Sequence, residues 1–317
     1  MIEAIGTFVA SVRGILALDR DVIRSLQTLP SGPLIAVAIL LLACVSDVVG
    51  NSPLLFIRKM RPFLPGVGAL GTHVDAWEQR LVHVLAGALR DGVVLTGIFP
   101  FTVRNDTLIE RRPTAWLWRW LARVRQERPS LVAKLIDWRN LTQVFVSMDP
   151  RYGPIYNKGV ADKLTASLSG QGYVAGSKRP VTLVGYSGAA QVALGAALYL
   201  AHDLQAPVTV ISLGGVLGDD PALATVEHLH HLWGTHDVEA RLAAVAMPAR
   251  WPIAKRSRWN RAIMAGRLTQ TCLGAMHHAG ARGYLDPDTW TPEGRSYLEV
   301  TASTILEIID SRSSGAR

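Results

Sequence analysis

The sequence predicts an α/β fold in which helices cover both faces of a mostly parallel sheet. Short runs rich in β-branched residues, bounded by glycine or proline, alternate with helical stretches after residue 65, and this alternation is typical of such sheets. The chain has 317 residues, of which 49% are hydrophobic, so it can form a large core and is not expected to be disordered. Only two cysteines are present, which excludes a disulfide scaffold.

The expected strands and helices follow one another in a regular order. The strands are predicted at 92–101, 141–150, 180–187, 207–215 and 226–234. The helices are predicted at 75–92, 159–172 and 188–204. Right-handed crossovers bring the loops that follow parallel strands to one edge of the sheet, and we expect a functional site at that edge.

Residues 1–65 are expected to form a separate helical, hydrophobic segment ahead of an α/β domain over 66–317. Twelve consecutive apolar residues occupy 34–45. A helix that spans a bilayer needs about 20 such residues, so two interpretations stay open. One is a membrane-associated segment, which would be peripheral, a single span or, as the G-N-S-P break at 50–53 favours, kinked or re-entrant. The other is a helix buried against the domain. We favour association with a membrane, and we expect this to be the cell membrane of a bacterium.

The most informative motif is a strand followed by G-x-S-x-A and an apolar helix, over 181–204. A serine hydroxyl is a weak nucleophile, so it needs an exposed position beside a base and a preformed anion site. A sharp turn from strand to helix provides this for Ser187, and it requires small residues such as Gly185 and Ala189 on either side. The Gly188 amide, at the start of the helix, would be one oxyanion donor. The simpler alternative is a turn of small residues that only lets strand and helix pack closely.

This motif resembles the nucleophile elbow of the α/β-hydrolases, and the resemblance extends over about residues 90–310. Residues 66–317 would then be the catalytic domain. The family's order of nucleophile, acid and histidine implies Asp237, which follows the strand at 226–234, as the acid. It implies His278, in an H-x-G sequence followed by a tyrosine, as the base. His277 is the second choice for the base.

Other site residues implied by the resemblance rest on weaker matches. Phe99, in the loop after the first predicted strand, would supply the second oxyanion amide. Asp219 and Asp220, after the strand at 207–215, are the alternative acids, because Asp237 could equally be a helix cap or a turn residue.

No cofactor or metal is expected. Four histidines crowd the stretch before Asp237, but alternating residues of a strand point to opposite faces, and no carboxylate or histidine pair has the helical spacing of zinc ligands. These histidines are His228, His230, His231 and His236.

Two basic, aromatic insertions are predicted near 104–140 and 240–268. The first contains Trp116, Trp118, Trp120 and Trp138. The second lies in a window, 240–285, that has eight basic residues and no acidic ones. The charge of this window therefore equals the net charge of the whole chain, +8. Tryptophan beside arginine is typical of bilayer interfaces, so we expect an anionic membrane surface as a partner. No nucleic-acid motif is present, so nucleic acid is not expected. The alternative is a set of helices whose tryptophans face the core.

The expected function is that of a membrane-associated serine hydrolase that cleaves an ester or thioester of an apolar, lipid-like acyl group through an acyl-enzyme. Lipase, esterase, thioesterase and acyltransferase share this chemistry, and the sequence does not separate them. The alternative is an inactive α/β-hydrolase-fold protein that binds a lipid or a partner at the membrane. The oligomeric state is left open.

Overall fold

The computed structural model describes residues 63–64, 76–89, 94–96, 98, 100–101 and 131–315, all within one compact unit that runs from residue 55 to residue 317. The hydrophobic run at 34–45 and most of the first basic insertion lie outside these residues. Among the helices that are described, none combines the length and the apolar character needed to cross a bilayer.

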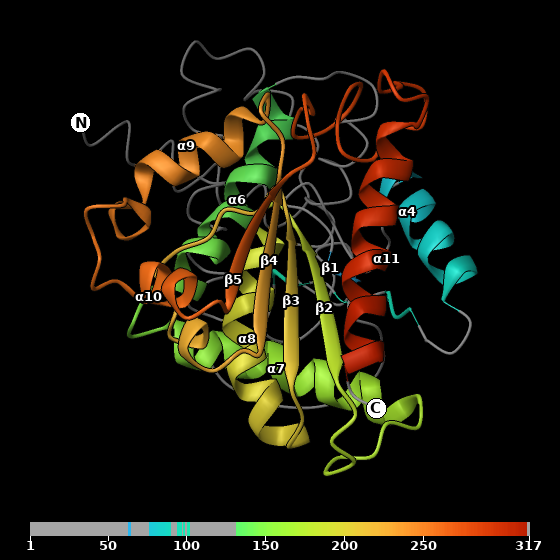
Figure 1. Cartoon of the computed structure of the whole chain (residues 1–317). Helices are drawn as coiled ribbons and strands as arrows, with labels where there is room; N and C mark the ends of the chain where they lie inside the picture. Colours follow the sequence, from blue (N-terminus) through green and yellow to red (C-terminus); the bar gives the residue numbers. More distant parts are fainter. Residues whose placement is uncertain are drawn as a thin grey trace, which may run out of the picture. The chain divides into compact units, whose positions relative to one another are not determined.

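A parallel sheet lies at the centre of the unit (Figure 1), with strand order β1-β2-β3-β4-β5. Every neighbouring pair in it is parallel. The strands are β1 (Phe63–Leu64), β2 (Val181–Tyr186), β3 (Val208–Leu213), β4 (His228–Trp233) and β5 (Leu268–Cys272). Four strands of five or six residues thus form the sheet, and the two-residue β1 extends it at one edge. The predicted α/β class with a parallel sheet is confirmed.

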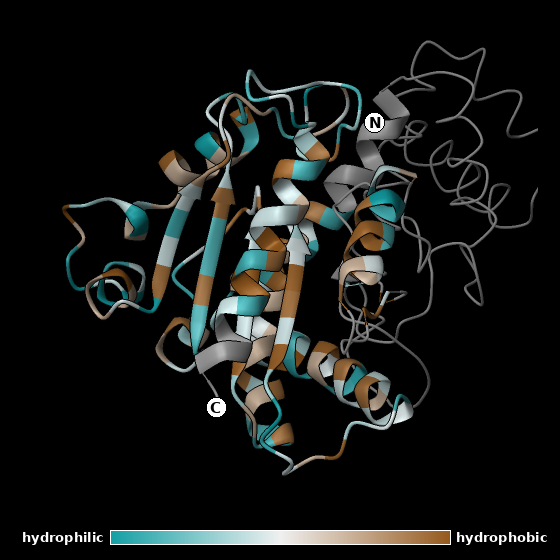
Figure 2. Cartoon of the chain, turned by 45° about the vertical axis from the view of Figure 1, so that its right-hand side comes forward, coloured by the Kyte–Doolittle hydropathy of each residue, from teal (hydrophilic) through white to brown (hydrophobic). Residues whose placement is uncertain are grey.

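The helices pack in two layers, one on each face of the sheet. The helix α8 (Ala189–Leu204) contacts β2 and β3, and α7 (Gly153–Gly170) and α6 (Leu131–Met148) pack on it. On the other face lie α4 (Ala76–Ala88) and α11 (Tyr297–Gly315). Their leucine and isoleucine side chains share one core cluster with Val184, Ile211, Leu213 and Leu232 of the strands. Figure 2 shows apolar residues in brown along these strands and helices.

Most of the predicted elements around the serine motif are present. The strands predicted at 180–187, 207–215 and 226–234 correspond to β2, β3 and β4. The helices predicted at 75–92 and 188–204 correspond to α4 and α8, and the helix predicted at 159–172 is the second half of α7.

The strand predicted at 141–150 is wrong, because residues 141–148 belong to α6, which ends at Met148. The β-branched valines of this stretch suggested a strand. The buried residues instead recur at helical spacing, at Asn140, Val144 and Ser147, and this face packs on α7 and α8. Tertiary packing therefore outweighs local β propensity here.

The strand predicted at 92–101 is not a strand in its described residues, which are 94–96, 98 and 100–101. Its apolar side chains are nevertheless buried, since Leu95, Ile98 and Phe101 are at most 4% exposed. The strand beside β2 is β1 instead. The segment is apolar because its side chains are buried, and this apolar composition led to the prediction of a strand.

Several elements near the C-terminus were not predicted from the sequence. The edge strand β5 is mostly polar, and only Leu268 of its five residues is buried. Its sequence therefore lacks the apolar run from which a strand is predicted. Between β4 and β5 lie α9 (Val238–Ala246), η2 (Pro248–Arg250) and α10 (Arg258–Met264). A further short helix, η1 (Pro221–Ala224), follows β3. The second basic insertion, 240–268, therefore consists of α9, η2 and α10.

The helical layer on the α8 side depends on one buried amide. The Nδ2 group of Asn157 on α7 donates to the Ser147 carbonyl oxygen at 3.0 Å, and the Ser147 hydroxyl donates to Asn157 Oδ1 at 2.7 Å. Gly195 of α8 leaves room for this amide, because a Cβ there would lie only 2.3 Å from Asn157 Nδ2. The missing side chain on α8 thus lets α6 and α7 join above it.

We expect Asn157→Ala to lower the free energy of unfolding by roughly 1–3 kcal/mol, because a buried hydroxyl and a buried carbonyl lose their partner. Urea unfolding followed by circular dichroism measures this loss. The exposed Ser169, on the same helix, gives the control, and Ser169→Ala should change stability by less than about 0.5 kcal/mol. Equal effects of the two substitutions would contradict the role of the amide.

Candidate functional site

The turn between β2 and α8 holds Ser187 in a strained backbone conformation, and the residue is only 5% exposed, so the exposed position expected from the sequence is not found. Ser187 has φ +56°, in the left-handed region that side chains normally avoid. Its amide donates to the Leu213 carbonyl oxygen at 2.9 Å, which anchors the turn to β3. A Cβ on Gly185 would lie 2.5 Å from the Ala190 Cα, so the strand and helix approach too closely for any larger residue. This is the local geometry that the G-x-S-x-A motif predicts.

His278 lies in the loop after β5 and joins two residues that are far away in the sequence. Its Nε2 atom is 2.8 Å from Ser187 Oγ, and its Nδ1 atom is 2.9 Å from Asp237 Oδ2. The His278 side chain is 12% exposed and the Asp237 side chain is fully buried. The structure therefore brings together the three residues that the resemblance implied, in one chain of hydrogen bonds.

Asp237 begins α9 directly after β4 and accepts hydrogen bonds through both carboxylate oxygens. Its Oδ1 accepts from the Ala240 amide at 2.7 Å, as a helix cap does. Its Oδ2 accepts from the Tyr284 hydroxyl at 2.6 Å. Burial raises the pKa of Asp237, but the hydrogen bond and charge of His278, with the Ala240 and Tyr284 donors, outweigh it and hold the pKa below its ordinary value. Asp237 is therefore ionised at neutral pH.

Tyr284 fixes the Asp237 carboxylate from behind. Its hydroxyl accepts a hydrogen bond from the Gly234 amide at 2.8 Å while it donates to Asp237. Burial, followed by the negative charge of Asp237, raises the pKa of Tyr284, so the hydroxyl remains a proton donor. The sequence motif pointed to this tyrosine only as a neighbour of the histidine loop, and not to its contact with the acid.

Tyr186, the residue before the serine, holds the histidine loop in place. Its hydroxyl donates to the His278 carbonyl oxygen at 2.6 Å. Its ring stacks on the imidazole with centroids 5.6 Å apart. Sequence reasoning did not select Tyr186, because the middle position of the motif accepts many residues.

Gly214, at the end of β3, is a second position that sequence reasoning missed. Its φ is +55°, and a Cβ there would lie 2.7 Å from the Tyr284 ring, 2.8 Å from Asp237 Oδ2 and 3.3 Å from His278 Nδ1. Only glycine leaves room for the acid and the histidine to meet. The two consecutive glycines after this strand, Gly214 and Gly215, were the sequence feature that could have indicated such a close approach.

The alternative site residues lie elsewhere. His277 is exposed, and its ring lies 5.4 Å from that of His236. Asp220 accepts from the Gln191 amide at 2.7 Å and caps η1 through the Ala222 amide. Asp219 accepts from the Trp259 backbone amide at 2.9 Å. Asp237 alone among the three aspartates is hydrogen-bonded to His278.

One of the two residues predicted to be oxyanion donors lies in the described part of the chain. Gly188 is the N-cap residue of α8, directly beside Ser187, and amides at a helix N-terminus favour a negative charge. Phe99 lies outside the described residues. Its neighbour Pro100 is buried, and the Tyr156 hydroxyl donates to the Pro100 carbonyl oxygen at 2.5 Å.

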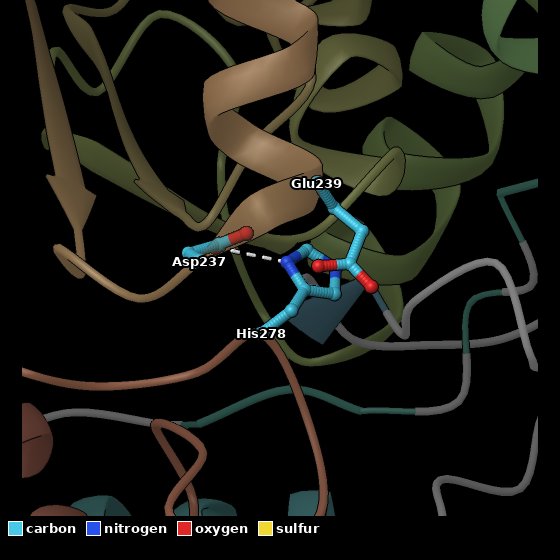
Figure 3. A group of neighbouring side chains, drawn as sticks. All are labelled: Asp237, Glu239 and His278. Carbon is cyan, nitrogen blue, oxygen red and sulfur yellow. Dashed lines mark hydrogen bonds and ion pairs between the residues drawn. The ribbon is translucent and has the colours of Figure 1, made fainter.

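A second carboxylate, that of Glu239, lies beside His278, and with it one group among the described residues could hold a metal ion. Ligand atoms of Asp237, Glu239 and His278 lie within 4.8 Å of one another, and Figure 3 shows the Glu239 carboxylate beside the His278 ring. Two of the three are already joined by a 2.9 Å hydrogen bond. A metal ion would have to displace this bond, so the arrangement favours the hydrogen-bonded pair.

The histidines of β4 divide between the two faces of the sheet, as the strand periodicity requires. His228 and His230 stack on one face with ring centroids 4.1 Å apart. His231 is on the other face, where its Nδ1 lies 3.1 Å from Ser212 Oγ and its Nε2 lies 3.3 Å from the Arg250 guanidinium. Burial, and then the charge of Arg250, lowers the pKa of His231 to about 3, so this histidine packs as a neutral side chain.

The tryptophans of the insertions have different environments. Trp116, Trp118 and Trp120 lie outside the described residues, as does the Trp138 side chain. Trp259 on α10 is 1% exposed and stacks under Arg250, whose guanidinium carbon lies 4.2 Å from the ring centroid. Trp251 is 44% exposed. The core-facing alternative is therefore correct for Trp259 and wrong for Trp251.

We expect Asp237→Asn to destabilise the protein at neutral pH by roughly 1–3 kcal/mol, because three donors lose a charged acceptor. The folded-state pKa of Asp237 lies below the ordinary value of about 3.9, so its stabilisation is present above about pH 4 and is lost as pH falls through the folded-state pKa. The stability difference between wild type and Asp237→Asn should therefore shrink on acidification. Urea unfolding at a series of pH values measures it.

Asp220→Asn is the matched control, since Asp220 is also a buried aspartate that caps a helix, here η1. Burial raises the pKa of Asp220, so its contribution is present at low pH and is lost as pH rises through the folded-state pKa. The difference between wild type and Asp220→Asn should change with pH in the opposite direction. The same trend in both variants would refute the ionised state assigned to Asp237.

Comparison with family models, with curated proteins and with solved structures gave no match for this chain. The parallel sheet and its flanking helices assign the chain to the α/β class. What the site does must then be argued from the contacts of Ser187, His278 and Asp237.

Proposed function

We propose that the protein is a serine hydrolase that cleaves an ester or thioester of an apolar acyl group through an acyl-enzyme. The observation that carries this proposal is the continuous chain from Ser187 Oγ to His278 Nε2, at 2.8 Å, and from His278 Nδ1 to Asp237, at 2.9 Å. These lengths are those expected between a nucleophile, its base and the group that orients the base. The order of the three residues in the chain, and the strained serine between β2 and α8, support membership of the α/β-hydrolases.

Each residue has a defined part in the proposed reaction. Ser187 Oγ attacks the carbonyl carbon of the substrate while His278 Nε2 takes its proton, and the ionised Asp237 holds Nδ1–H and stabilises the imidazolium. The Gly188 amide donates to the oxyanion. The intermediate then expels the alcohol or thiol, which receives the proton from His278. Water repeats the sequence with His278 as base, and the free acid and Ser187 are released.

The substrate and the location are proposed from the surroundings of the site. Exposed apolar side chains on α9 begin at Val238, directly after Asp237, and suit an apolar acyl group. The apolar run at 34–45 and the net charge of +8 support a location at an anionic membrane, such as a bacterial cell membrane. Neither a cofactor nor a metal ion takes part in the proposed reaction.

A fluorophosphonate probe tests the nucleophile, because it forms a covalent bond with an activated serine and releases fluoride. We expect wild type to be labelled and Ser187→Ala to be unlabelled, with the modified peptide containing Ser187. An Ala variant that keeps its label would exclude Ser187. A wild-type protein that is never labelled would favour the alternative, an inactive fold that binds a lipid or a partner.

A substitution at Gly214 tests whether the three residues act together. In Gly214→Ala the new Cβ would push on Asp237 and Tyr284, and displacing reacting groups by about 1 Å can cost roughly a hundredfold in rate. We therefore expect labelling to slow by about this factor. Gly266 has a similar φ of +66° with nothing within 4 Å of a Cβ, so Gly266→Ala is the matched control and should be labelled at close to the wild-type rate. Equal rates for the two variants would contradict the proposed arrangement.

A further inference from the structure

The helix α9 exposes its large apolar side chains to solvent and buries only small ones. Its buried positions are the small Ala240 and Ala243, which are 5% and 6% exposed. Its large apolar residues Val238, Leu242 and Val245 are 56%, 63% and 68% exposed. The spacing of these three residues, i, i+4 and i+7, places them on one face of the helix. A surface helix normally presents polar residues there, so the exposed face fits contact with something apolar.

The apolar face continues into the segment after α9. Ile253 is 85% exposed and Trp251 is 44% exposed. The Trp251 indole N–H donates to the Val245 carbonyl oxygen at 3.1 Å, which ties this ring to the end of α9. We call the exposed side chains of Val238, Leu242, Val245, Trp251 and Ile253 the α9–η2 surface.

The segment that carries this surface is held in a fixed conformation. The Nδ2 atom of Asn260 on α10 lies 2.8 Å from the Trp251 carbonyl oxygen and 3.0 Å from that of Ala254. Both α9 and α10 pack on η2. The surface is therefore formed before any partner arrives, so binding costs little ordering of the chain.

Positive charge is combined with this surface. Arg241 on α9 and the neighbouring Lys255 and Arg256 are all exposed. The window 240–285 contains eight basic residues and no acidic one. The combination of aliphatic side chains, an exposed tryptophan and cations is typical of a bilayer interface, where the ring lies at headgroup depth and the cations meet phosphate. Nucleic acid would use the cations but gains little from exposed leucine, valine and isoleucine, since bases stack on aromatic rings.

The position of α9 connects this surface to the proposed site. Asp237 is both the N-cap of α9 and the residue bonded to His278. Val238, the first residue of the helix, belongs to the α9–η2 surface, and Glu239 reaches toward the His278 ring (Figure 3). A partner that contacts this face of α9 therefore lies close to Asp237 and His278.

We propose that the α9–η2 surface docks the protein on an anionic lipid bilayer, with Leu242 and Val245 in the interface. The inference rests on the proposed function in one respect: if the site is a hydrolase, docking would present it to substrates held in the bilayer. The docking itself depends on the exposed apolar face and the cations beside it. It applies equally to a protein with an inactive site.

The test uses the full chain with Ser187→Ala, so that no lipid is hydrolysed, and with Cys44 and Cys272 replaced by serine. Leu242→Cys is labelled with an environment-sensitive fluorophore such as NBD. Phosphatidylcholine vesicles with and without phosphatidylglycerol are then added. We expect a several-fold rise in emission and a blue shift with the anionic vesicles, and a smaller response at high salt because the charges are screened.

Ile155 gives the matched control, since it is 63% exposed, as Leu242 is, and lies on α7. The label on Ile155→Cys should not respond. No response at Leu242, or equal responses at both positions, would overturn the proposal even if the protein sediments with the vesicles, because the label reports contact at its own position. A response at Leu242 to single-stranded oligonucleotide but not to anionic vesicles would also overturn it.

A charge variant completes the test. In the unlabelled protein, Leu242→Glu with Val245→Glu should reduce sedimentation with anionic vesicles, whereas Ile155→Glu with Val174→Glu adds the same charge at residues that are 63% and 67% exposed elsewhere and should leave sedimentation unchanged. Equal reduction by both pairs would attribute binding to net charge alone and refute the docking surface. Failure of Ser187 to react with a fluorophosphonate leaves these results unaffected, so the two proposals fail separately.

Discussion

The candidate site depends on the hydrogen bonds of the Asp237 carboxylate. One oxygen caps α9 through the Ala240 amide, and the other accepts from Tyr284 and lies 2.9 Å from His278 Nδ1. A buried charge is tolerated only when it is well paired, and here its donors come from the backbone, a phenol and an imidazole. The same charge therefore begins a helix, orients a histidine and fixes the loop that carries Tyr284. Local folding and site geometry depend on a single group.

Close packing at the ends of the parallel strands makes this contact possible. At the end of β2, Gly185 lets the chain turn sharply into α8, and after β3, Gly214 leaves space for Asp237 and His278. After β4, a Cβ on Gly234 would lie 2.3 Å from the Met276 carbonyl oxygen. Three successive strand ends thus carry glycine, at β2 for the turn into α8, and after β3 and β4 because the loops that follow these strands converge. The convergence itself follows from the parallel order of the sheet.

The charge and the apolar surplus of the chain separate in space. The apolar residues of β2, β3, α8 and the facing helices are in the core, while the basic residues of 240–285 border a helix with an exposed apolar face. Arg250 is the exception, because it packs over Trp259, and burial lowers its pKa to about 10. Arg258 pairs with Asp219, and Arg267 donates to the Ala224 carbonyl oxygen. The other cations of the window, Arg241, Lys255, Arg256, Arg261 and Arg282, are exposed. In the proposed docking, the position of the exposed cations therefore matters more than the net charge alone.

The sequence by itself determined the parallel α/β class, the strands β2 to β4 and the elbow at Ser187, because periodicity and small-residue spacing are local signals. It also pointed to Asp237 and His278, but their pairing was implied by a resemblance and not by any local pattern. Only the tertiary structure showed that α6 is a helix, since its buried face is defined by α7 and α8. It alone separated His278 from His277 and Asp237 from Asp220, and it revealed the roles of Tyr186 and Gly214 and the contact of Tyr284 with Asp237. These distinctions depend on distances between residues 41 and 91 positions apart, and such distances are set by how the strands are ordered in the sheet.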